Sequence, residues 1–174
     1  SSSIGIHVVH KIQELQSLLP LNGEYIAQEC KIGEEYTVNV YFDTSGTLRC
    51  AVPHQRLETR NGEVSKGLTQ RHQGLLTLAQ KMGGALPGAR AALCFQAIID
   101  EAGAPWIIEL NARFGGGYPL THKAGAHFSR WLLEESLGKA PSYTDAWEDD
   151  LLMLRYDAAV FVSRGAGSEE QPDE

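Results

Sequence analysis

The chain has 174 residues, 43% of them hydrophobic and 21% charged, which fits a globular protein with a real core and excludes a disordered one. Its formal net charge of −7 argues against nucleic-acid binding, which needs a basic surface to neutralise phosphates. The sequence has no apolar run long enough to span a bilayer and no signal-peptide pattern. Three widely spaced cysteines favour reduced thiols in a cytoplasmic protein over a disulfide framework.

The chain opens with a small polar segment that contains Ser2, Ser3 and Gly5. Such a loop can present hydroxyl and backbone N–H groups to phosphate, and a frayed terminus explains the same residues equally well. Apolar residues at 12, 15, 18 and 19 then predict a short helix, which Pro20 ends.

Three strands are predicted next, over residues 24–30, 35–42 and 47–57. Glycine-containing turns at 31–34 and 43–46 separate them, and consecutive strands joined by short turns form an antiparallel meander. Arg56, Arg60 and Lys66 are assigned to a polar connection after these strands. For any one of these three residues, a solvated basic edge is the simplest interpretation.

The second half of the chain alternates between helical and strand patterns, which together predict an α+β protein with a mainly antiparallel sheet flanked by helices. A helix is expected over 73–82 with Gly83 and Gly84 as its stop, and another from 118 to 137 with Gly138 as its stop. Strands are expected over 91–99, from 106 onward, and over 151–162. The acidic residues 163–174 indicate a disordered tail.

The most informative segment is the apolar strand that begins at Trp106. Glu109, Asn111 and Arg113 occupy every second position, so they share one face if the strand persists, whereas residues 106, 108 and 110 would face a core. Three glycines at 115–117 follow and allow the backbone to approach a ligand closely. If the preceding turn consists of Ala102 and Gly103, Gln96 lies directly opposite Glu109.

Carboxylate and amide oxygens suit a hard cation such as magnesium, and an arginine suits a phosphate. Simple exposure to water explains one polar residue on a strand, but it explains poorly a polar face flanked by apolar residues and glycines. The sequence lacks the His-Glu-x-x-His, Gly-x-Ser-x-Gly, Walker A and Gly-x-Gly-x-x-Gly patterns, which argues against zinc peptidases, serine hydrolases, P-loop enzymes and Rossmann dehydrogenases.

The segment Glu109-Leu110-Asn111-Ala112-Arg113 with its following glycines resembles the metal-binding strand of ATP-grasp enzymes, especially relatives of the carbamoyl phosphate synthase large subunit. The Glu-x-Asn-x-Arg core is shared with biotin carboxylase and less completely with D-alanine–D-alanine ligase. Other segments are similar to the adenine hinge (28–30), the strand after it (33–38), a stretch of carbamoyl-phosphate-synthase-like members (56–67) and their closing strand (154–157). The resemblance spans residues 1–162, as part of one ATP-grasp domain.

The resemblance implies that the chain binds ATP. Ser2, Ser3 and Gly5 would belong to a small loop that contacts phosphate. Glu29 and Cys30 would meet the adenine, mainly through their backbone.

Glu35, by the same resemblance, would hold the ribose hydroxyls. Arg56 and Lys66 are further candidates for contact with phosphate or substrate.

Glu109 and Asn111 would bind magnesium, or manganese, with Gln96 where many relatives have a carboxylate. Arg113 would contact the γ-phosphate or stabilise an acyl phosphate formed from it. The implied parent is an ATP-dependent ligase that joins a small carboxylate substrate to an amine or a thiol.

Complete relatives have an N-terminal domain and an ATP-binding lysine ahead of the small loop. The chain is therefore expected to be a truncated part of a longer protein, and by itself to bind nucleotide weakly and catalyse nothing. Two other classes stay open: a non-catalytic nucleotide-binding or interaction module, and a metal-dependent hydrolase. The hydrolase would need a second carboxylate near Glu109, which the neutral Gln96 does not supply.

Overall fold

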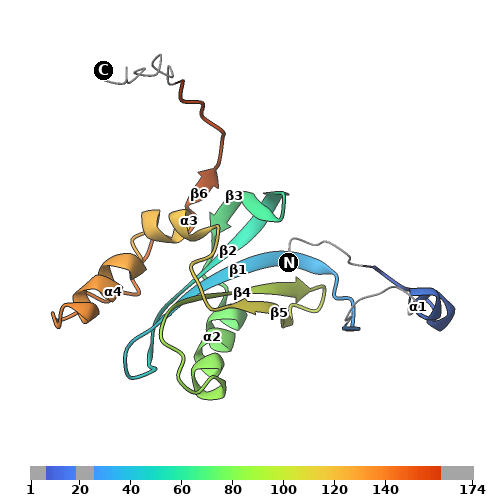
Figure 1. The fold of residues 1–174 in the computed structure, drawn as a ribbon, viewed down its shortest axis with the longest axis horizontal. Helices are drawn as coiled ribbons and strands as arrows, with labels where there is room; N and C mark the ends of the chain where they lie inside the picture. Colours follow the sequence, from blue (N-terminus) through green and yellow to red (C-terminus); the bar gives the residue numbers. More distant parts are fainter. Residues whose placement is uncertain (1–6, 19–25, 162–174) are drawn as a thin grey trace, which may run out of the picture.

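The computed structural model describes residues 7–18 and 26–161, and its centre is a six-stranded sheet in which every neighbouring pair is antiparallel (Figure 1). The strand order is β5-β4-β1-β2-β3-β6. The strands are β1 (Gly33–Phe42), β2 (Leu48–Arg60), β3 (Glu63–Thr69), β4 (Ala91–Asp100), β5 (Pro105–Asn111) and β6 (Leu152–Leu154). The helices are α1 (Ile12–Leu18), α2 (Gln73–Ala85), α3 (Tyr118–Lys123) and α4 (Phe128–Ser136). The predicted α+β class is confirmed.

Helix α2 covers one face of the sheet (Figure 1). Leu75, Ala79 and Met82 recur on one side of the helix and are buried, as its sequence period predicts. They pack against alternate residues of β1 and β4, namely Tyr36, Val38, Val40, Phe42, Leu93, Phe95, Ala97 and Ile99. The predicted stop at Gly83 is wrong, because α2 continues to Ala85. A Cβ at Gly83 would lie 3.2 Å from the Phe42 ring. Glycine there lets the helix continue close against the sheet.

Helices α3 and α4 cover only part of the opposite face (Figure 1). At that end Tyr41 packs edge-on against Trp131, with ring centroids 5.4 Å apart, and Phe128 and Trp147 complete a second buried core. The prediction of one continuous helix from 118 to 137 is wrong. Gly125, with φ of 106°, lies between α3 and α4, and only glycine adopts that backbone conformation easily.

The predicted polar connection after residue 57 is also wrong, because it is a β-hairpin. Strand β2 continues to Arg60 and β3 begins at Glu63, so only Asn61 and Gly62 connect them. Both residues have positive φ, 54° and 80°, which is the conformation of the tight turns that match the twist of paired strands. Arg56 and Lys66 therefore lie within paired strands.

One predicted strand is absent from the described residues, and another is too long. The strand expected over 24–30 is wrong for the described residues 26–30, which pair with no other strand. The strand expected over 151–162 is reduced to β6, which pairs with β3 over three residues. Residues 155–161 are exposed. The Arg155 N–H still donates to the Ser65 carbonyl at 2.8 Å, but the described residues beyond it form no strand.

The β4–β5 hairpin places Gln96 opposite Glu109, as predicted, although its turn differs from the expected one. Asp100 and Ala104 close a three-residue turn, which shifts the register by one residue. A bulge between Gln96 and Ala97 shifts it back. On the turn side of this bulge, Trp106 lies opposite Ile98. The predicted burial of residues 106 and 110 is wrong, because each is 41% exposed on an edge strand.

Candidate functional site

The candidate site is the part of the second sheet face that α3 and α4 leave open. Side chains alternate along strands, so Thr37, Gln96 and Asn111 project from three neighbouring strands to this side. Together with Arg56 and Arg113 they line a narrow cavity of about 60 Å³. The glycine run at 115–117 forms another wall of the same cavity.

Glu109 and Asn111 lie two residues apart on β5 and form a hydrogen bond. Asn111 Nδ2 donates to Glu109 Oε1 across 2.7 Å, which orients the amide and leaves its oxygen, Oδ1, available as a ligand. Directly across the hairpin, Gln96 is paired with Glu109. One carboxylate and two amide oxygens are a donor set that fits a hard cation that retains water or phosphate oxygens.

Arg56 also lines this cavity, and its side chain is only 8% exposed. Its guanidinium donates to Glu35 Oε2 at 3.3 Å and to Thr37 Oγ1 at 3.2 Å, and a third bond reaches the Gly62 carbonyl at 3.0 Å. The buried guanidinium of Arg56 would be costly without a partner charge. Glu35, adjacent to it on the open face, supplies that charge.

Strand β5 ends at Asn111, so Arg113 lies beyond it. The condition under which Arg113 would share the strand face of Glu109 and Asn111 is therefore not met. Arg113 nevertheless reaches the cavity that Gln96 and Asn111 line. Its Nη1 donates to the Phe114 carbonyl at 3.0 Å. The charge of Arg113 favours the thiolate of the nearby Cys94, but burial outweighs it and raises the pKa of that thiol.

The three glycines cross the sheet in close contact with several different side chains. A Cβ at Gly115 would lie 3.1 Å from both Asn39 Oδ1 and Cys94 Sγ. One at Gly116 would lie 2.8 Å from the Glu63 carboxyl carbon, and one at Gly117 only 2.4 Å from His54 Nε2. Glycine is therefore required by the sheet beneath the turn, not only by a ligand above it.

His54 is completely buried under this turn. Neither ring nitrogen has a hydrogen-bond partner among the described residues. Burial, followed by the nearby charge of Arg56, lowers the pKa of His54 to about 3. The ring is neutral at physiological pH and packs the turn against β2, a role that its position inside a strand pattern did not reveal.

Several predicted site residues do not join this group. Lys66 lies on β3, where its Nζ contacts Glu58 Oε2 at 2.5 Å, and it does not line the cavity. Glu29 and Cys30 are exposed in the unpaired segment before β1, where Glu29 Oε1 contacts Lys31 Nζ at 2.7 Å. Ser2, Ser3 and Gly5, like the tail at 163–174, lie outside the described residues.

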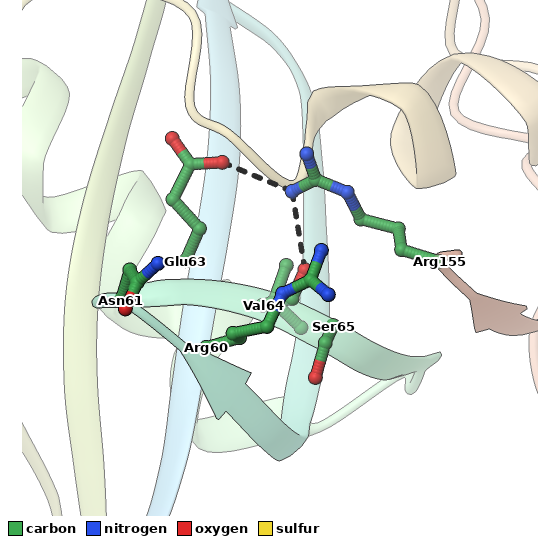
Figure 2. Close-up of a pocket in the computed structure, with 6 residues that line it drawn as sticks. All are labelled: Arg60, Asn61, Glu63, Val64, Ser65 and Arg155. Atoms are coloured by element: carbon green, nitrogen blue, oxygen red, sulfur yellow. Dashed lines mark hydrogen bonds and ion pairs between the residues drawn. The ribbon is translucent and has the colours of Figure 1, made fainter. Parts of the chain in front are cut away.

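A second cavity, of about 360 Å³, lies beside the first and was not expected from the sequence. Its lining residues are Arg60, Asn61, Glu63, Val64, Ser65 and Arg155 (Figure 2). Arg155 Nη1 donates to Glu63 Oε2 at 3.0 Å and to the Val64 carbonyl at 3.3 Å. Glu63 and Val64 also line the first cavity, so the two spaces share a wall.

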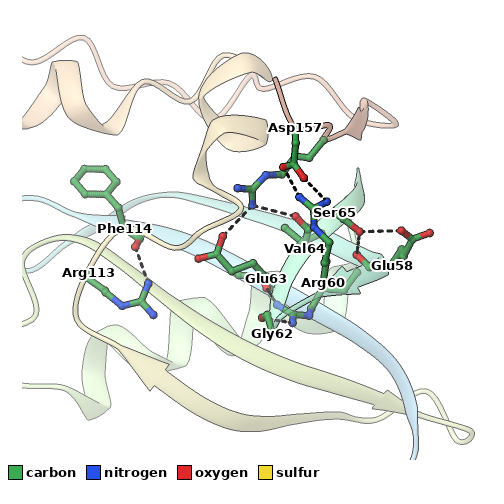
Figure 3. Close-up of polar contacts among 12 residues, drawn as sticks. Glu58, Arg60, Gly62, Glu63, Val64, Ser65, Arg113, Phe114 and Asp157 are labelled. Atoms are coloured by element: carbon green, nitrogen blue, oxygen red, sulfur yellow. Dashed lines mark hydrogen bonds and ion pairs between the residues drawn. The ribbon is translucent and has the colours of Figure 1, made fainter. Parts of the chain in front are cut away.

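Several separate polar contacts surround this wall (Figure 3). Arg60 donates two hydrogen bonds to the Asp157 carboxylate, at 2.8 and 2.6 Å, which is the strong bidentate geometry. Between β3 and β2, Ser65 Oγ donates to the Glu58 carbonyl at 3.1 Å. The Asn61-Gly62 dipeptide was the signal that could have identified this hairpin and its charged residues.

In the part of the chain that the structure describes, no three His, Cys, Asp or Glu side chains converge as a metal site. Any cation at Glu109 would thus take further ligands from amides, water or a bound substrate. No described helix has both the length and the apolar composition needed to cross a membrane.

Comparison with solved structures shows the same fold in larger proteins. The biotin carboxylase domain of a single-chain bacterial carboxylase matches 82% of this chain and 35% of its own, with a TM-score of 0.56 and 16% identity. The Hydrogenobacter thermophilus 2-oxoglutarate carboxylase domain, solved with MgADP and bicarbonate, matches 68% of this chain and 28% of its own, with a TM-score of 0.54 and 16% identity.

The Campylobacter jejuni biotin carboxylase, solved with a β,γ-ATP complex, gives a TM-score of 0.53 at 14% identity over 80% of this chain and 33% of its own. The chain thus spans about a third of the length of these structures. No curated protein sequence matches it. A family model described as ATP-grasp in the biosynthetic pathway with Ter operon matches residues 23–158, which is most of the chain. The chain therefore belongs to this ATP-grasp family.

Proposed function

We propose that this chain is the ATP- and magnesium-binding portion of an ATP-dependent ligase that activates a carboxylate as an acyl phosphate. The observation that carries the proposal is the convergence of Gln96, Glu109, Asn111 and Arg113 around one open part of the sheet. These residues combine oxygen ligands for a cation with a guanidinium for phosphate. The MgADP named for one of the compared structures and the ATP complex named for another are consistent with that chemistry.

Glu109 and Asn111 would hold magnesium, or manganese, on the β5 side of the cavity, with Gln96 as a neutral third donor. Magnesium bound there would neutralise charge on the transferred phosphate and its neighbour. Arg113, from the loop after β5, would stabilise the same developing charge from the glycine side. Arg56, already oriented by Thr37 and Glu35, would contact either phosphate or the carboxylate substrate.

Two alternatives to the ligase are a nucleotide-binding module and a metal-dependent hydrolase. A non-catalytic nucleotide-binding module would bind Mg-ATP and show no turnover. This alternative is supported by the length of the match, since the chain spans only about a third of the compared structures. A metal-dependent hydrolase has less support, because Gln96 occupies the position directly opposite Glu109 where a second carboxylate would activate water.

Calorimetric titration with Mg-ATP tests the proposal in the wild type, Glu109→Gln and Glu101→Gln. Glu101 is an exposed acid on the turn of the same hairpin, so its replacement removes the same charge outside the site. We expect Glu109→Gln to weaken binding at least tenfold and Glu101→Gln to leave it unchanged, and we expect the difference to vanish when EDTA removes magnesium. Equal affinity in all three proteins would refute the metal assignment, and ADP release in the same samples separates a ligase from a binding module.

A further inference from the structure

The cavity between the β2–β3 hairpin and β6 presents charges of both signs to its interior. Arg60 and Arg155 contribute positive charge, Glu63 contributes a carboxylate, and Asn61 adds an amide (Figure 2). Val64 is the one apolar side chain in the lining. At about 360 Å³ the cavity falls in the range of small-molecule sites, roughly 300–1,000 Å³.

The charges are already paired, and this pairing restricts what can bind. Arg155 contacts Glu63, and Arg60 contacts Asp157 at the rim. A purely anionic ligand would meet the Glu63 carboxylate, and a purely cationic ligand would meet two guanidinium groups. A neutral ligand would separate the pairs without replacing them, which leaves charges without partners. A ligand with both charges can enter the Arg155–Glu63 pair and satisfy each group.

Glu63 lies between this cavity and the smaller one that Gln96, Asn111 and Arg113 line. Its carboxylate lies against Gly116, where a Cβ would be 2.8 Å from the carboxyl carbon. Glu63 lines both spaces, and Arg113 lines the smaller of them. A cationic group held by Glu63 would therefore sit at the boundary, next to the glycine turn, while an anionic group would extend toward Arg155 and Arg60.

We infer that this cavity is a binding site for a free α-amino acid, with its ammonium on Glu63 and its carboxylate on Arg155 and Arg60. An α-amino acid carries its ammonium and its carboxylate on the same carbon, so the two charges lie close together, as the neighbouring Glu63 and Arg155 require. The remaining volume accommodates a side chain against Asn61 and Val64. The role of this amino acid as the amine acceptor rests on the proposed ligase function, whereas the binding site itself does not.

The test is an NMR titration of the ¹⁵N-labelled full chain, without nucleotide, with each standard amino acid. We expect at least one to give saturable shifts at the amides of Asn61, Glu63, Val64 and Arg155. The best binder is then compared with its des-amino acid and with its methyl ester, which each lack one charge. We expect both analogues to bind at least tenfold more weakly.

Variants assign the contacts. Glu63→Gln, which keeps the size of the side chain, should weaken the amino acid at least tenfold but not the des-amino acid. Arg155→Met should weaken both. Arg130→Met is the matched control, since Arg130 is an exposed arginine paired with Glu134 within α4 at 2.8 Å, and it should change neither.

Absence of saturable shifts in the wild type, or equal affinity for the amino acid and its des-amino analogue, would overturn the inference. Titration of the same samples with Mg-ATP separates this result from the proposed function. Amino-acid binding without nucleotide binding would retain the site and reject the ligase, and nucleotide binding without amino-acid binding would do the reverse.

Discussion

His54 shows how a single buried side chain couples the glycine turn to the sheet. Its ring has no exposed surface and no hydrogen-bond partner among the described residues. Burying a polar ring without hydrogen bonds costs stability. The ring therefore contributes through packing, because it fills the space under Gly117. The same burial makes the ring a pH-dependent element of stability.

The pKa of His54 falls from 6.5 to about 3 on folding, so only the unfolded state takes up a proton between these values. The free energy of unfolding should therefore fall as pH decreases below 6.5, by about 1.4 kcal/mol per pH unit from this group. Urea unfolding at pH 7.5 and 5.0 measures the loss. We expect His54→Leu to show a smaller loss than the wild type, and exposed His7→Gln to match the wild type. Identical pH dependence in all three would contradict the assignment.

Gly117 should tolerate no side chain. Its added Cβ would meet His54 Nε2 at 2.4 Å and Cε1 at 2.7 Å, and the fully buried ring cannot move aside. We expect Gly117→Ala to lower the free energy of unfolding by about 1–3 kcal/mol, as overpacking does. Gly84→Ala is the control, because nothing lies within 4 Å of its Cβ and alanine favours a helix by about 0.5–1 kcal/mol. A stable Gly117→Ala protein would show that the turn moves freely.

At the scale of elements, the β4–β5 hairpin combines a bulge with an edge strand to direct its side chains. The bulge places Trp106 on the same face as Gln96 and Glu109, which is a common use of bulges beside functional sites. There Lys31 Nζ lies 3.6 Å from the Trp106 ring centroid, and Trp106 Nε1 donates to Asp100 Oδ2 at 2.7 Å. The tryptophan thus connects the segment before β1, which is expected to meet adenine, to the hairpin that carries the proposed metal ligands.

Trp106→Leu should release this segment, whereas Trp106→Phe keeps an aromatic face for the Lys31 ammonium. We expect the leucine variant to be less stable than the phenylalanine variant by about 0.5–1 kcal/mol, the contribution of a cation–π contact. Limited trypsin digestion under native conditions provides the second measurement, since Lys31 should be cut faster in Trp106→Leu. Equal cleavage of the two variants would mean that the ring does not restrain Lys31.

For the whole molecule, the second sheet face holds both buried thiols, and no described cysteine forms a disulfide. Among the described cysteines, Cys50 and Cys94 are buried and Cys30 is exposed. Burial, which is the largest cause in each case, raises the pKa of both Cys50 and Cys94, and reactivity requires the thiolate. The expectation of reduced thiols can therefore be tested by counting.

Titration with an aromatic disulfide reagent should modify one cysteine in the native protein and three in denaturant. Cys30→Ser should remove the fast-reacting thiol and leave the two slow ones. Rapid reaction of two or more thiols in the native state would show that the second sheet face opens readily. Lower totals in denaturant would indicate that a disulfide had formed.

The amino-acid sequence by itself determined the local features of this protein. Period-two alternation predicted β1, β4 and the shared face of Glu109 and Asn111, and the helical period predicted the buried side of α2. The pattern does not predict strand β3, because the basic residues on both sides of the Asn-Gly turn are equally typical of a polar loop. These features depend on neighbours within a few residues, which is why the pattern contains them.

Tertiary structure decided the rest, because it depends on residues far apart in the chain. The glycine run was predicted to approach a ligand, but the contacts with Glu63 and His54 that also require glycine come from β3 and β2. The expected Gln96–Glu109 pairing arises from a bulge that compensates a longer turn, and no local pattern specified either. Arg155 and Glu63 are 92 positions apart, so only the closing of β6 onto β3 could bring their charges into one cavity.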